Sequence, residues 1–224
     1  LLTLDIEELP ERAEEHLRFT VISDTHERHG GFVIPECDVL LHCGDILATS
    51  RMATDAHAEE VLRDFGDWLR SAPCSARVVI AGNHDAALTR LGRELVKELL
   101  KGSTFLNFET TELLIPGRHK AIVVYGAPYS IGTSRNRHEQ DEKTQSLLLG
   151  NAPEHADVVI THGPHQGLVP ECLEKLKPLL HGCGHAHDEY GSIVPLSSGI
   201  SVNAAVMKNT LFGPRPRNLP IVVD

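Results

Sequence analysis

Short apolar runs recur along the chain, and each is followed at once by a compact group of Asp, His, Asn and Gly residues. Runs of this length that are rich in Val, Ile and Leu are typical of strands buried on both faces. The pattern occurs five times: Phe19–Ile22 precedes Ser23–His26, Val39–Leu41 precedes His42–Asp45, Val78–Ile80 precedes Gly82–Asp85, Val158–Ile160 precedes Thr161–Gly163, and Leu179–Leu180 precedes Gly182–His187. In α/β sheets, ligands bind beyond the carboxyl ends of the strands. The pattern therefore predicts one shared site supplied by five strand ends.

Segments between these runs have the periodicity of amphipathic helices. Helices are predicted over Ala53–Ser71, Leu91–Lys101 and Gln140–Leu149, and the last two end at a glycine, a common helix terminator. Three more strands are predicted over Ala121–Tyr125, Ile200–Asn203 and Ile221–Val223. Helix and strand alternate early, whereas the later chain is richer in strands and turns. We therefore predict an α/β (α+β) fold in which a two-sheet β-sandwich is flanked by helices.

The composition is that of an ordinary globular domain, with 41% hydrophobic and 23% charged residues in a chain of 224. No apolar run approaches the roughly 20 residues of a membrane helix, so no membrane association is expected. The acidic N-terminus lacks the apolar block of a signal peptide, although the chain begins at Leu1 and a removed leader stays open. Five cysteines without a C-x-x-C pair argue against a disulfide framework and a thiolate zinc site. We therefore expect a reducing, cytoplasmic location.

The net charge of −10 disfavours binding to a nucleic-acid polymer, which requires a basic surface. Fourteen histidines are many for this length, and bound divalent cations would reverse the electric field locally. A small anionic substrate is thus compatible with an acidic chain. The sequence does not indicate the oligomeric state.

The candidate metal ligands include two pairs, and the two residues of each pair are two positions apart. In an extended segment, both side chains of such a pair point to the same side. Asp24 and His26 form the first pair, and His185 and His187 form the second. A carboxylate together with imidazoles suits a divalent metal of intermediate hardness. Each pair is a weak signal alone, because a turn aspartate near a surface histidine is common.

The other candidates stand singly at the remaining strand ends. Asp45 follows a glycine, where an aspartate is more often a turn or cap residue than a ligand. Asn83 offers a neutral oxygen, and the adjacent His84 points elsewhere and is free for acid–base work. His162 alone is equally compatible with a core histidine. Because all five groups follow apolar runs, their joint occurrence by chance is remote, and a metal site is predicted.

The motifs D-T-H, G-D, G-N-H-D, T-H-G-P and G-H-A-H-D-E-Y-G, with V-N-A-A and a terminal N-L-P-I-V-V-D, resemble the calcineurin-like metallophosphoesterase superfamily. Within it, they look like the metallophosphoesterase-domain (brain 239-type) branch, which is related to class III cyclic-nucleotide phosphodiesterases. The resemblance covers residues 19–224, which implies a metallophosphoesterase domain there and an N-terminal extension over residues 1–18. The implied fold is again a two-sheet sandwich with flanking helices.

The resemblance also implies a centre of two divalent metal ions, with Mn, Fe or Zn as candidates. One metal is held by Asp24, His26 and His187, the other by Asn83, His162 and His185, while Asp45 bridges them and His84 is the catalytic histidine. The implied activity is the hydrolysis of phosphodiesters such as cyclic nucleotides, or of related small phosphoesters, by attack of a metal-bridging hydroxide. His84 would donate a proton to the leaving oxygen and would be oriented by Asp85 or by a backbone carbonyl.

Departures from the superfamily pattern bear on the substrate. The segment after Asp45 reads I-L-A-T-S-R rather than the Y-V-D-R-G of protein phosphatases, and Asp85 stands where they have Glu, which disfavours a protein substrate. His165 replaces the second proline of T-H-G-P-P and either contacts substrate or lies exposed on a loop. Arg135 and Arg137 replace part of an aromatic-rich stretch, and either bind a phosphate or form a solvated basic loop.

Two other functions stay open at this point. A non-catalytic, metal-dependent nucleotide-binding or scaffold protein would keep the fold, although an intact ligand set beside His84 disfavours it. A dimetal enzyme with atypical chemistry on a specialised metabolite is the second, because bound metals polarise carbonyl groups as well as phosphoryl groups.

Overall fold

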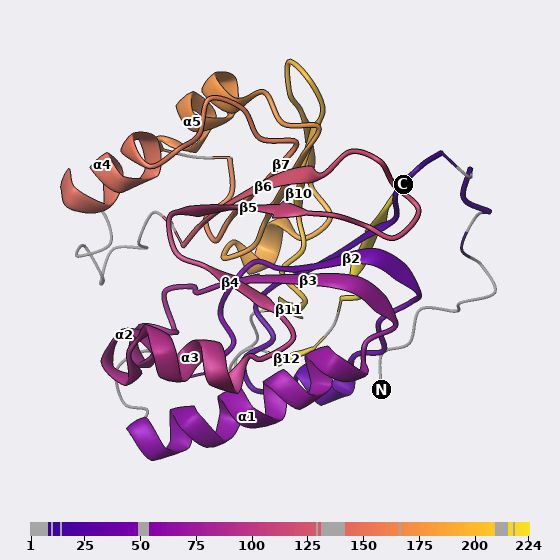
Figure 1. The fold of residues 1–224 in the computed structure, drawn as a ribbon. Coiled ribbons are helices and arrows are strands. Elements are labelled where there is room, and N and C mark those ends of the chain that lie inside the picture. Colours follow the sequence, from indigo (N-terminus) through magenta and orange to yellow (C-terminus); the bar gives the residue numbers. More distant parts are fainter. Residues whose placement is uncertain are drawn as a thin grey trace.

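Strands buried on both faces form the centre of the molecule, as the short Val- and Ile-rich runs predict. Figure 1 shows two β-sheets that pack face to face, with helices on the outer face of each. This computed structural model describes residues 9, 11–13, 15–48, 54–128, 130, 142–165, 167–208, 215–216 and 218–224. The predicted fold class, a two-sheet sandwich flanked by helices, is confirmed.

The first sheet has five strands within the described residues, in the order β13-β1-β2-β3-β4. Their bounds in this order are Ile221–Val223, Phe19–Ile22, Cys37–His42, Cys74–Ile80 and Thr104–Leu106. Strands β1 to β4 run parallel, and β13 pairs antiparallel with β1 at the sheet edge. The polar groups that follow β1, β2 and β3 therefore come together at one end of the sheet.

The second sheet has the described strands in the order β5-β6-β7-β8-β10-β9. Their bounds are Glu109–Leu113, Ile122–Ala127, Val158–Thr161, Leu180–Cys183, Ile200–Asn203 and Ile193–Pro195. The four central strands run parallel, while β5 and β9 are antiparallel edge strands. A separate pair joins β11 (Met207–Lys208) to β12 (Arg215–Pro216). A parallel bridge between Ser23 and Ala205 brings the carboxyl ends of β1 and β10 together.

Apolar side chains fill three layers. Between the sheets, Val21, Val39 and Val78 of the first sheet lie in one buried cluster with Val124 and Ile160 of the second. Neighbouring residues on the same strands, such as Ile22, Leu40 and Val79, point to the opposite face of the first sheet. They belong to a second buried cluster, which lies between this sheet and the helices that cover it. Burial on both faces explains why these strands are continuous apolar runs rather than alternating ones.

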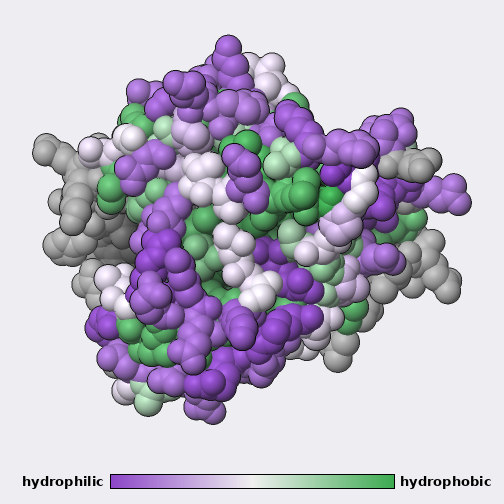
Figure 2. Space-filling model, viewed as in Figure 1, coloured by the Kyte–Doolittle hydropathy of each residue, from purple (hydrophilic) through white to green (hydrophobic). Residues whose placement is uncertain are grey.

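Helices α1 (Asp55–Ser71), α2 (Ala86–Leu91) and α3 (Arg93–Leu99) cover the first sheet, and α4 (Glu142–Gly150) and α5 (Val169–Leu176) cover the second. Thr54 caps α1, because its side chain accepts a hydrogen bond from the backbone N–H of His57 at 3.2 Å. Figure 2 shows that the outward face of α1, along the bottom of the view, is hydrophilic, as expected of an amphipathic helix. No helix in the described part of the chain has the length and apolar character needed to cross a membrane.

Several elements differ from the sequence predictions. The helix predicted over Leu91–Lys101 is interrupted, because Gly92 adopts a φ of 83° and separates α2 from α3. Helix α5 lies outside the predicted elements, although Val169, Cys172, Leu173 and Leu176 have helical spacing and are buried. The short edge strands β4, β5 and β9 also lie outside them, since segments such as Glu-Thr-Thr-Glu-Leu carry no clear apolar run.

Candidate metal centre

The loops after β1, β2, β3, β7 and β8 meet at the carboxyl ends of the two sheets, where backbone hydrogen bonds tie them together. The N–H of Asp24 donates to the carbonyl of Gly44, and the N–H of Gly184 donates to the carbonyl of His162, both at 2.9 Å. The structure brings the seven predicted metal ligands and the predicted catalytic histidine into one cluster: Asp24, His26, Asp45, Asn83, His84, His162, His185 and His187.

Four residues of this cluster have a left-handed backbone conformation, which residues other than glycine rarely adopt. The φ angles are 58° at Asp24, 42° at His26, 56° at Asp45 and 66° at His185. Such a conformation costs on the order of 1–3 kcal/mol per residue and persists only where surrounding contacts determine it. The two carboxylates and two histidines are therefore held in place by the fold rather than by local preference.

Glycines let the loops approach one another closely. A Cβ atom on Gly82 would overlap the carboxylate of Asp45, and one on Gly184 would overlap the hydroxyl of Ser23 and the carboxylate of Asp24. The close atoms include the backbone nitrogen of Asp45 and the Cβ atom of Ser23, each 2.5 Å away, which cannot turn aside as the tip of a side chain can. Both positions therefore require glycine.

Asp24, His26 and His187 form one group of potential metal ligands. The Oδ1 atom of Asp24 lies 3.1 Å from Nε2 of His187, which in turn lies 3.3 Å from Nε2 of His26. Burial raises the pKa of Asp24, but the hydrogen bond from His187 and the charges of His162 and His187 outweigh it, so that the pKa lies below its usual value. The group thus presents one carboxylate and two imidazole nitrogens to a common point.

Asn83, His162 and His185 meet on the other side of the cluster. The Oδ1 atom of Asn83 lies 2.8 Å from both Nε2 of His162 and Nδ1 of His185. The two imidazole rings stand edge to face, with their centroids 5.1 Å apart. One amide oxygen and two ring nitrogens therefore converge here as well.

Asp45 lies between these two groups and is 2% exposed. Its Oδ2 atom is 3.8 Å from Nε2 of His26, and its Oδ1 atom is 3.4 Å from Nε2 of His162. Burial raises the pKa of this carboxyl, but the charge and hydrogen bond of His162 and the charges of His84 and His26 outweigh it and hold the pKa far below its usual range. An ionised carboxylate that reaches both groups can bridge two cations.

In His26 and His162, the hydrogen-bond partner of Nδ1 shows which ring nitrogen carries the lone pair. Nδ1 of His26 lies 2.9 Å from the carbonyl oxygen of Leu47, and Nδ1 of His162 lies 2.9 Å from that of Cys43. Because a carbonyl oxygen only accepts, each Nδ1 carries the hydrogen and each neutral ring turns an Nε2 lone pair into the cluster. Around His162, that lone pair meets the acceptor oxygens of Asn83 and Asp45.

Because the oxygens of Asn83 and Asp45 both face Nε2 of His162, a positive charge at this point is favourable. In the metal-free chain, a proton on His162 supplies it: burial lowers the pKa of this ring, but the charges of Asp45 and Asp24 and the hydrogen bond to Asp45 outweigh burial and raise the pKa to about 10. A divalent cation among nitrogen and oxygen ligands would also supply positive charge. The residues present therefore fit the metals that the sequence predicts.

His84 lies at the rim of the cluster, with its side chain 33% exposed. Its Nδ1 donates to the carbonyl oxygen of Ala48 at 2.9 Å, and its ring packs edge-on against that of His26 with the centroids 4.8 Å apart. Its Nε2 lies 4.0 Å from Oδ2 of Asp45. A backbone carbonyl, one of the two partners that the sequence allowed, thus orients this ring.

The carboxylate of Asp85, which the sequence predicts to be catalytic, is turned toward backbone donors in the structure, and its catalytic role stays a prediction. Its carboxylate accepts from the backbone N–H groups of Gly82 and Leu47, both at 2.8 Å, and of Ile46 at 3.2 Å. Burial, together with the charge of Asp45, raises its pKa to about 7. Asp85 therefore fastens the loop after β2 to the loop after β3, because its buried oxygens are committed to backbone donors.

Of the three predicted substrate contacts, His165 alone lies among the described residues. His165 is half-buried in the turn after β7 and does not belong to the groups of potential ligands found among the described residues. Arg135 and Arg137 lie outside the described residues. Contact of these three side chains with substrate stays a prediction.

Glu27 and the backbone carbonyls of Cys43, Leu47 and Ala48 support the site but are absent from the sequence predictions. Oε1 of Glu27 accepts a hydrogen bond from the N–H of Ala48 at 3.0 Å. A signal for Glu27 exists, since it is the acidic residue directly after D-T-H. The carbonyls have none, because every residue carries one.

Comparison with known proteins identifies relatives over most of the chain. Metallophosphoesterase domain-containing protein 1 of Homo sapiens is 28% identical over 250 residues, which cover 93% of this chain and 71% of that protein. A UPF0046 protein of Caenorhabditis elegans is 27% identical over 246 residues, which cover 94% of this chain and 82% of that protein. Among solved structures, a novel archaeal phosphodiesterase aligns over 84% of each chain with a TM-score of 0.39 and 13% identity.

The family profile of the calcineurin-like phosphoesterases matches residues 17–189. That range includes all the strand ends that build the cluster, from Asp24 to His187. The chain therefore belongs to the calcineurin-like phosphoesterase family.

Proposed function

We propose that the protein hydrolyses phosphodiesters such as cyclic nucleotides, or related small phosphoesters, with two divalent metal ions. The position of Asp45 carries the proposal, because its carboxylate lies within 4.0 Å of the Nε2 atoms of His26, His84 and His162. Family membership and the name of the human relative, a metallophosphoesterase domain-containing protein, support the reaction class.

Seven side chains divide between two metal positions in this proposal. Asp24, His26 and His187 would hold one metal ion, Asn83, His162 and His185 would hold the other, and the carboxylate of Asp45 would be shared between them. These nitrogen and oxygen ligands suit Mn, Fe or Zn. When bound, the two ions lower the pKa of water and neutralise charge on the phosphoryl oxygens.

His84 supplies the proton chemistry. Its Nδ1 is held by the carbonyl of Ala48, so that Nε2 faces the cluster before any substrate arrives. A protonated Nε2 donates its hydrogen to the leaving oxygen of the ester as the P–O bond breaks. The partial exposure of the ring lets it meet substrate and regain a proton from solvent.

A small anionic substrate and a reducing compartment are also part of the proposal. The net charge of −10 disfavours a nucleic-acid polymer as substrate. The five cysteines are free thiols, which supports a cytoplasmic location.

A phosphoester panel tests the proposal. Bis-p-nitrophenyl phosphate, cyclic nucleotides and monoesters are incubated with the protein and Mn²⁺, Zn²⁺, Fe²⁺ or a chelator. We expect hydrolysis of diesters that requires metal and is abolished by the chelator. The variant His84→Ala should retain its metal content while turnover falls by roughly 10²–10⁴-fold, the usual contribution of general acid–base catalysis.

Other outcomes favour the alternative functions. Nucleotide binding without metal-stimulated hydrolysis indicates a non-catalytic binding or scaffold protein. Full metal loading with no turnover anywhere on the panel indicates atypical chemistry at the same centre. Full activity of His84→Ala, or loss of metal from it, contradicts the role assigned to His84.

A further inference from the structure

Glu27 lies beside the cluster without belonging to the proposed ligand set. We propose that Glu27 is a positioning residue that orients the ring of His84 through the segment Ile46–Ala48, here named the 46–48 strap. The catalytic consequence of this proposal rests on the proposed function, whereas the positioning itself rests on hydrogen bonds that are independent of it.

All three carbonyl oxygens of the 46–48 strap accept hydrogen bonds from the site. The carbonyl of Ile46 accepts from the N–H of Glu27 at 2.7 Å. The carbonyl of Leu47 accepts from Nδ1 of His26 at 2.9 Å, and that of Ala48 accepts from Nδ1 of His84 at 2.9 Å. The conformation of the strap therefore sets the direction of two imidazole rings.

The three N–H groups of the strap donate to carboxylates. Those of Ile46 and Leu47 donate to Asp85 at 3.2 and 2.8 Å, and that of Ala48 donates to Oε1 of Glu27 at 3.0 Å. The strap lies between β2 and α1, outside any strand or helix of the described chain. Two carboxylates thus provide the pairing that secondary structure provides elsewhere.

The two carboxylates act on different parts of the strap. Asp85 fixes the N–H of Leu47, whose carbonyl holds His26, a proposed metal ligand. Glu27 fixes the N–H of Ala48, whose carbonyl holds His84. Loss of Glu27 should therefore affect the proposed proton donor more than metal binding.

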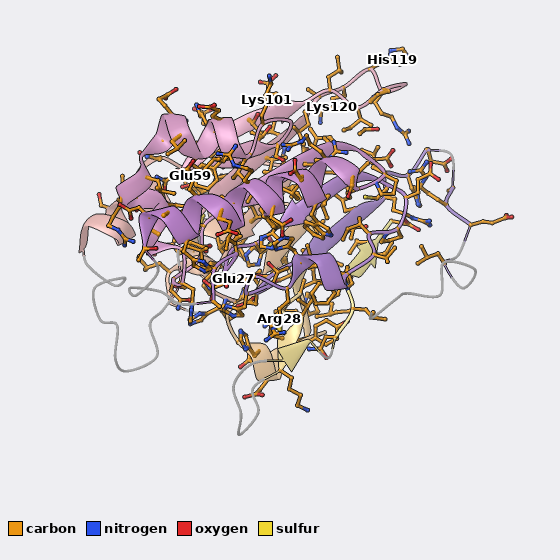
Figure 3. The ribbon with its side chains drawn as sticks, turned by 90° about the horizontal axis from the view of Figure 1, so that it is seen from below. Glu27, Arg28, Glu59, Lys101, His119 and Lys120 are labelled. Carbon is orange, nitrogen blue, oxygen red and sulfur yellow. The ribbon has the colours of Figure 1, made fainter. Side chains whose placement is uncertain are left out.

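Glu27 also contacts helix α1. Its backbone has a φ of 63°, in the left-handed region, and Oε1 lies 3.1 Å from Nε2 of His57 on α1. Its side chain is 25% exposed. Figure 3 shows Glu27 with Arg28 in the lower part of the view, away from His119 and Lys120 at the upper right. The neighbouring His57 provides a matched control, since it contacts Glu27 but not the strap atoms given above.

Three variants test the role of Glu27: Glu27→Ala, Glu27→Gln and His57→Ala. In Glu27→Ala, the N–H of Ala48 loses its acceptor, so we expect kcat to fall about tenfold, the lower end for partners that orient site residues. KM and metal content should stay unchanged. Glu27→Gln keeps an oxygen at Oε1 and should restore kcat, and His57→Ala should resemble the wild type.

Two readouts do not depend on activity. In Glu27→Ala, amide hydrogen exchange at Ala48 should become faster, and the NMR signals of the His84 ring nitrogens should shift. Both should stay as in the wild type in Glu27→Gln. Unchanged exchange and ring signals in Glu27→Ala, or a Glu27→Gln variant as impaired as Glu27→Ala, would overturn the proposal. If the wild type hydrolyses no phosphoester, the proposed function fails, while these two readouts still decide whether Glu27 orients His84.

Discussion

The Oδ1 atom of Asn83 lies 2.8 Å from Nε2 of His162, whose other ring nitrogen already donates to the carbonyl oxygen of Cys43. An amide oxygen only accepts, so a neutral His162 brings a lone pair against an acceptor at this point. Asp45 adds a carboxylate oxygen 3.4 Å from the same nitrogen. A bound cation would remove this unfavourable contact between a lone pair and acceptor oxygens. It would do so only in the folded chain, because the unfolded chain does not bring these loops together.

Metal binding should therefore stabilise the fold. At a free Mn²⁺ or Zn²⁺ concentration about 100-fold above the dissociation constant, the expected gain is about 2.7 kcal/mol. For a domain of this size, each kcal/mol raises Tm by about 2–4 °C. Thermal unfolding with metal and with chelator measures the shift, and the exposed-loop variant His155→Ala serves as a control that keeps it. Equal Tm values with metal and chelator would contradict metal binding at this cluster.

The variant Asp45→Asn should lose metal while keeping its fold. Asparagine tolerates the left-handed conformation that Asp45 adopts, at a φ of 56°, and retains an oxygen for the N–H of His84. It lacks the negative charge that draws two cations together, so metal affinity should fall at least about tenfold. Elemental analysis of the purified protein reports the loss. Asp64→Asn, whose side chain is 79% exposed, is the matched control, and wild-type metal content in Asp45→Asn would rule out the bridging role.

Replacing Gly184 by alanine should damage the site by crowding. The new methyl group would overlap the buried side chains of Ser23 and Asp24, including the Cβ atom of Ser23. Overpacking of this kind costs about 1–3 kcal/mol, and displacement of Asp24 should also lower metal occupancy. Chemical denaturation and elemental analysis measure the two effects. Gly30→Ala meets nothing within 4 Å and should leave both unchanged, and an equally small effect in Gly184→Ala would show that the loops can move apart.

The residues of the candidate site were predictable because strand ends carry them. Each apolar run led to its polar group, and parallel strands necessarily end together, so Asp24, Asp45 and Asn83 converge once the sheets form. The expected reason for the D-x-H spacing was different, however. Asp24 and His26 both have positive φ, so a turn beyond the strand, rather than the alternation of an extended segment, directs their side chains.

Contacts made by the backbone could not be predicted in this way. The carbonyl of Ala48 orients His84 across 36 residues of sequence, and no side-chain pattern marks it. Asp85 follows His84 directly and so suggests a shared catalytic role, but the turn sends its carboxylate to backbone donors instead. Similarly, the break at Gly92 depends on a positive φ that the apolar periodicity of Leu91–Lys101 does not reveal.

His181 should make the stability of the fold depend on pH. This ring is fully buried between Thr161, 2.8 Å from its Nε2, and Ser201, 2.7 Å from its Nδ1. Burial, with a smaller effect from the charge of His165, lowers its pKa from 6.5 to about 3. Below pH 6.5, the unfolded chain takes up a proton at this residue that the folded chain refuses, so stability is complete above this pH and is lost as pH falls toward 3.

The loss should reach about 1.4 kcal/mol per pH unit for this one group. Urea unfolding of the wild type and of His181→Gln, in chelator and at a series of pH values from 7 to 5, isolates it, because the other titrating groups are common to both proteins. As pH decreases, the free energy of unfolding of His181→Gln should fall less steeply than that of the wild type. The difference in slope should approach about 1.4 kcal/mol per pH unit, the value for uptake of one proton. Parallel curves for the two proteins would mean that His181 takes up a proton in the folded state as readily as in the unfolded one.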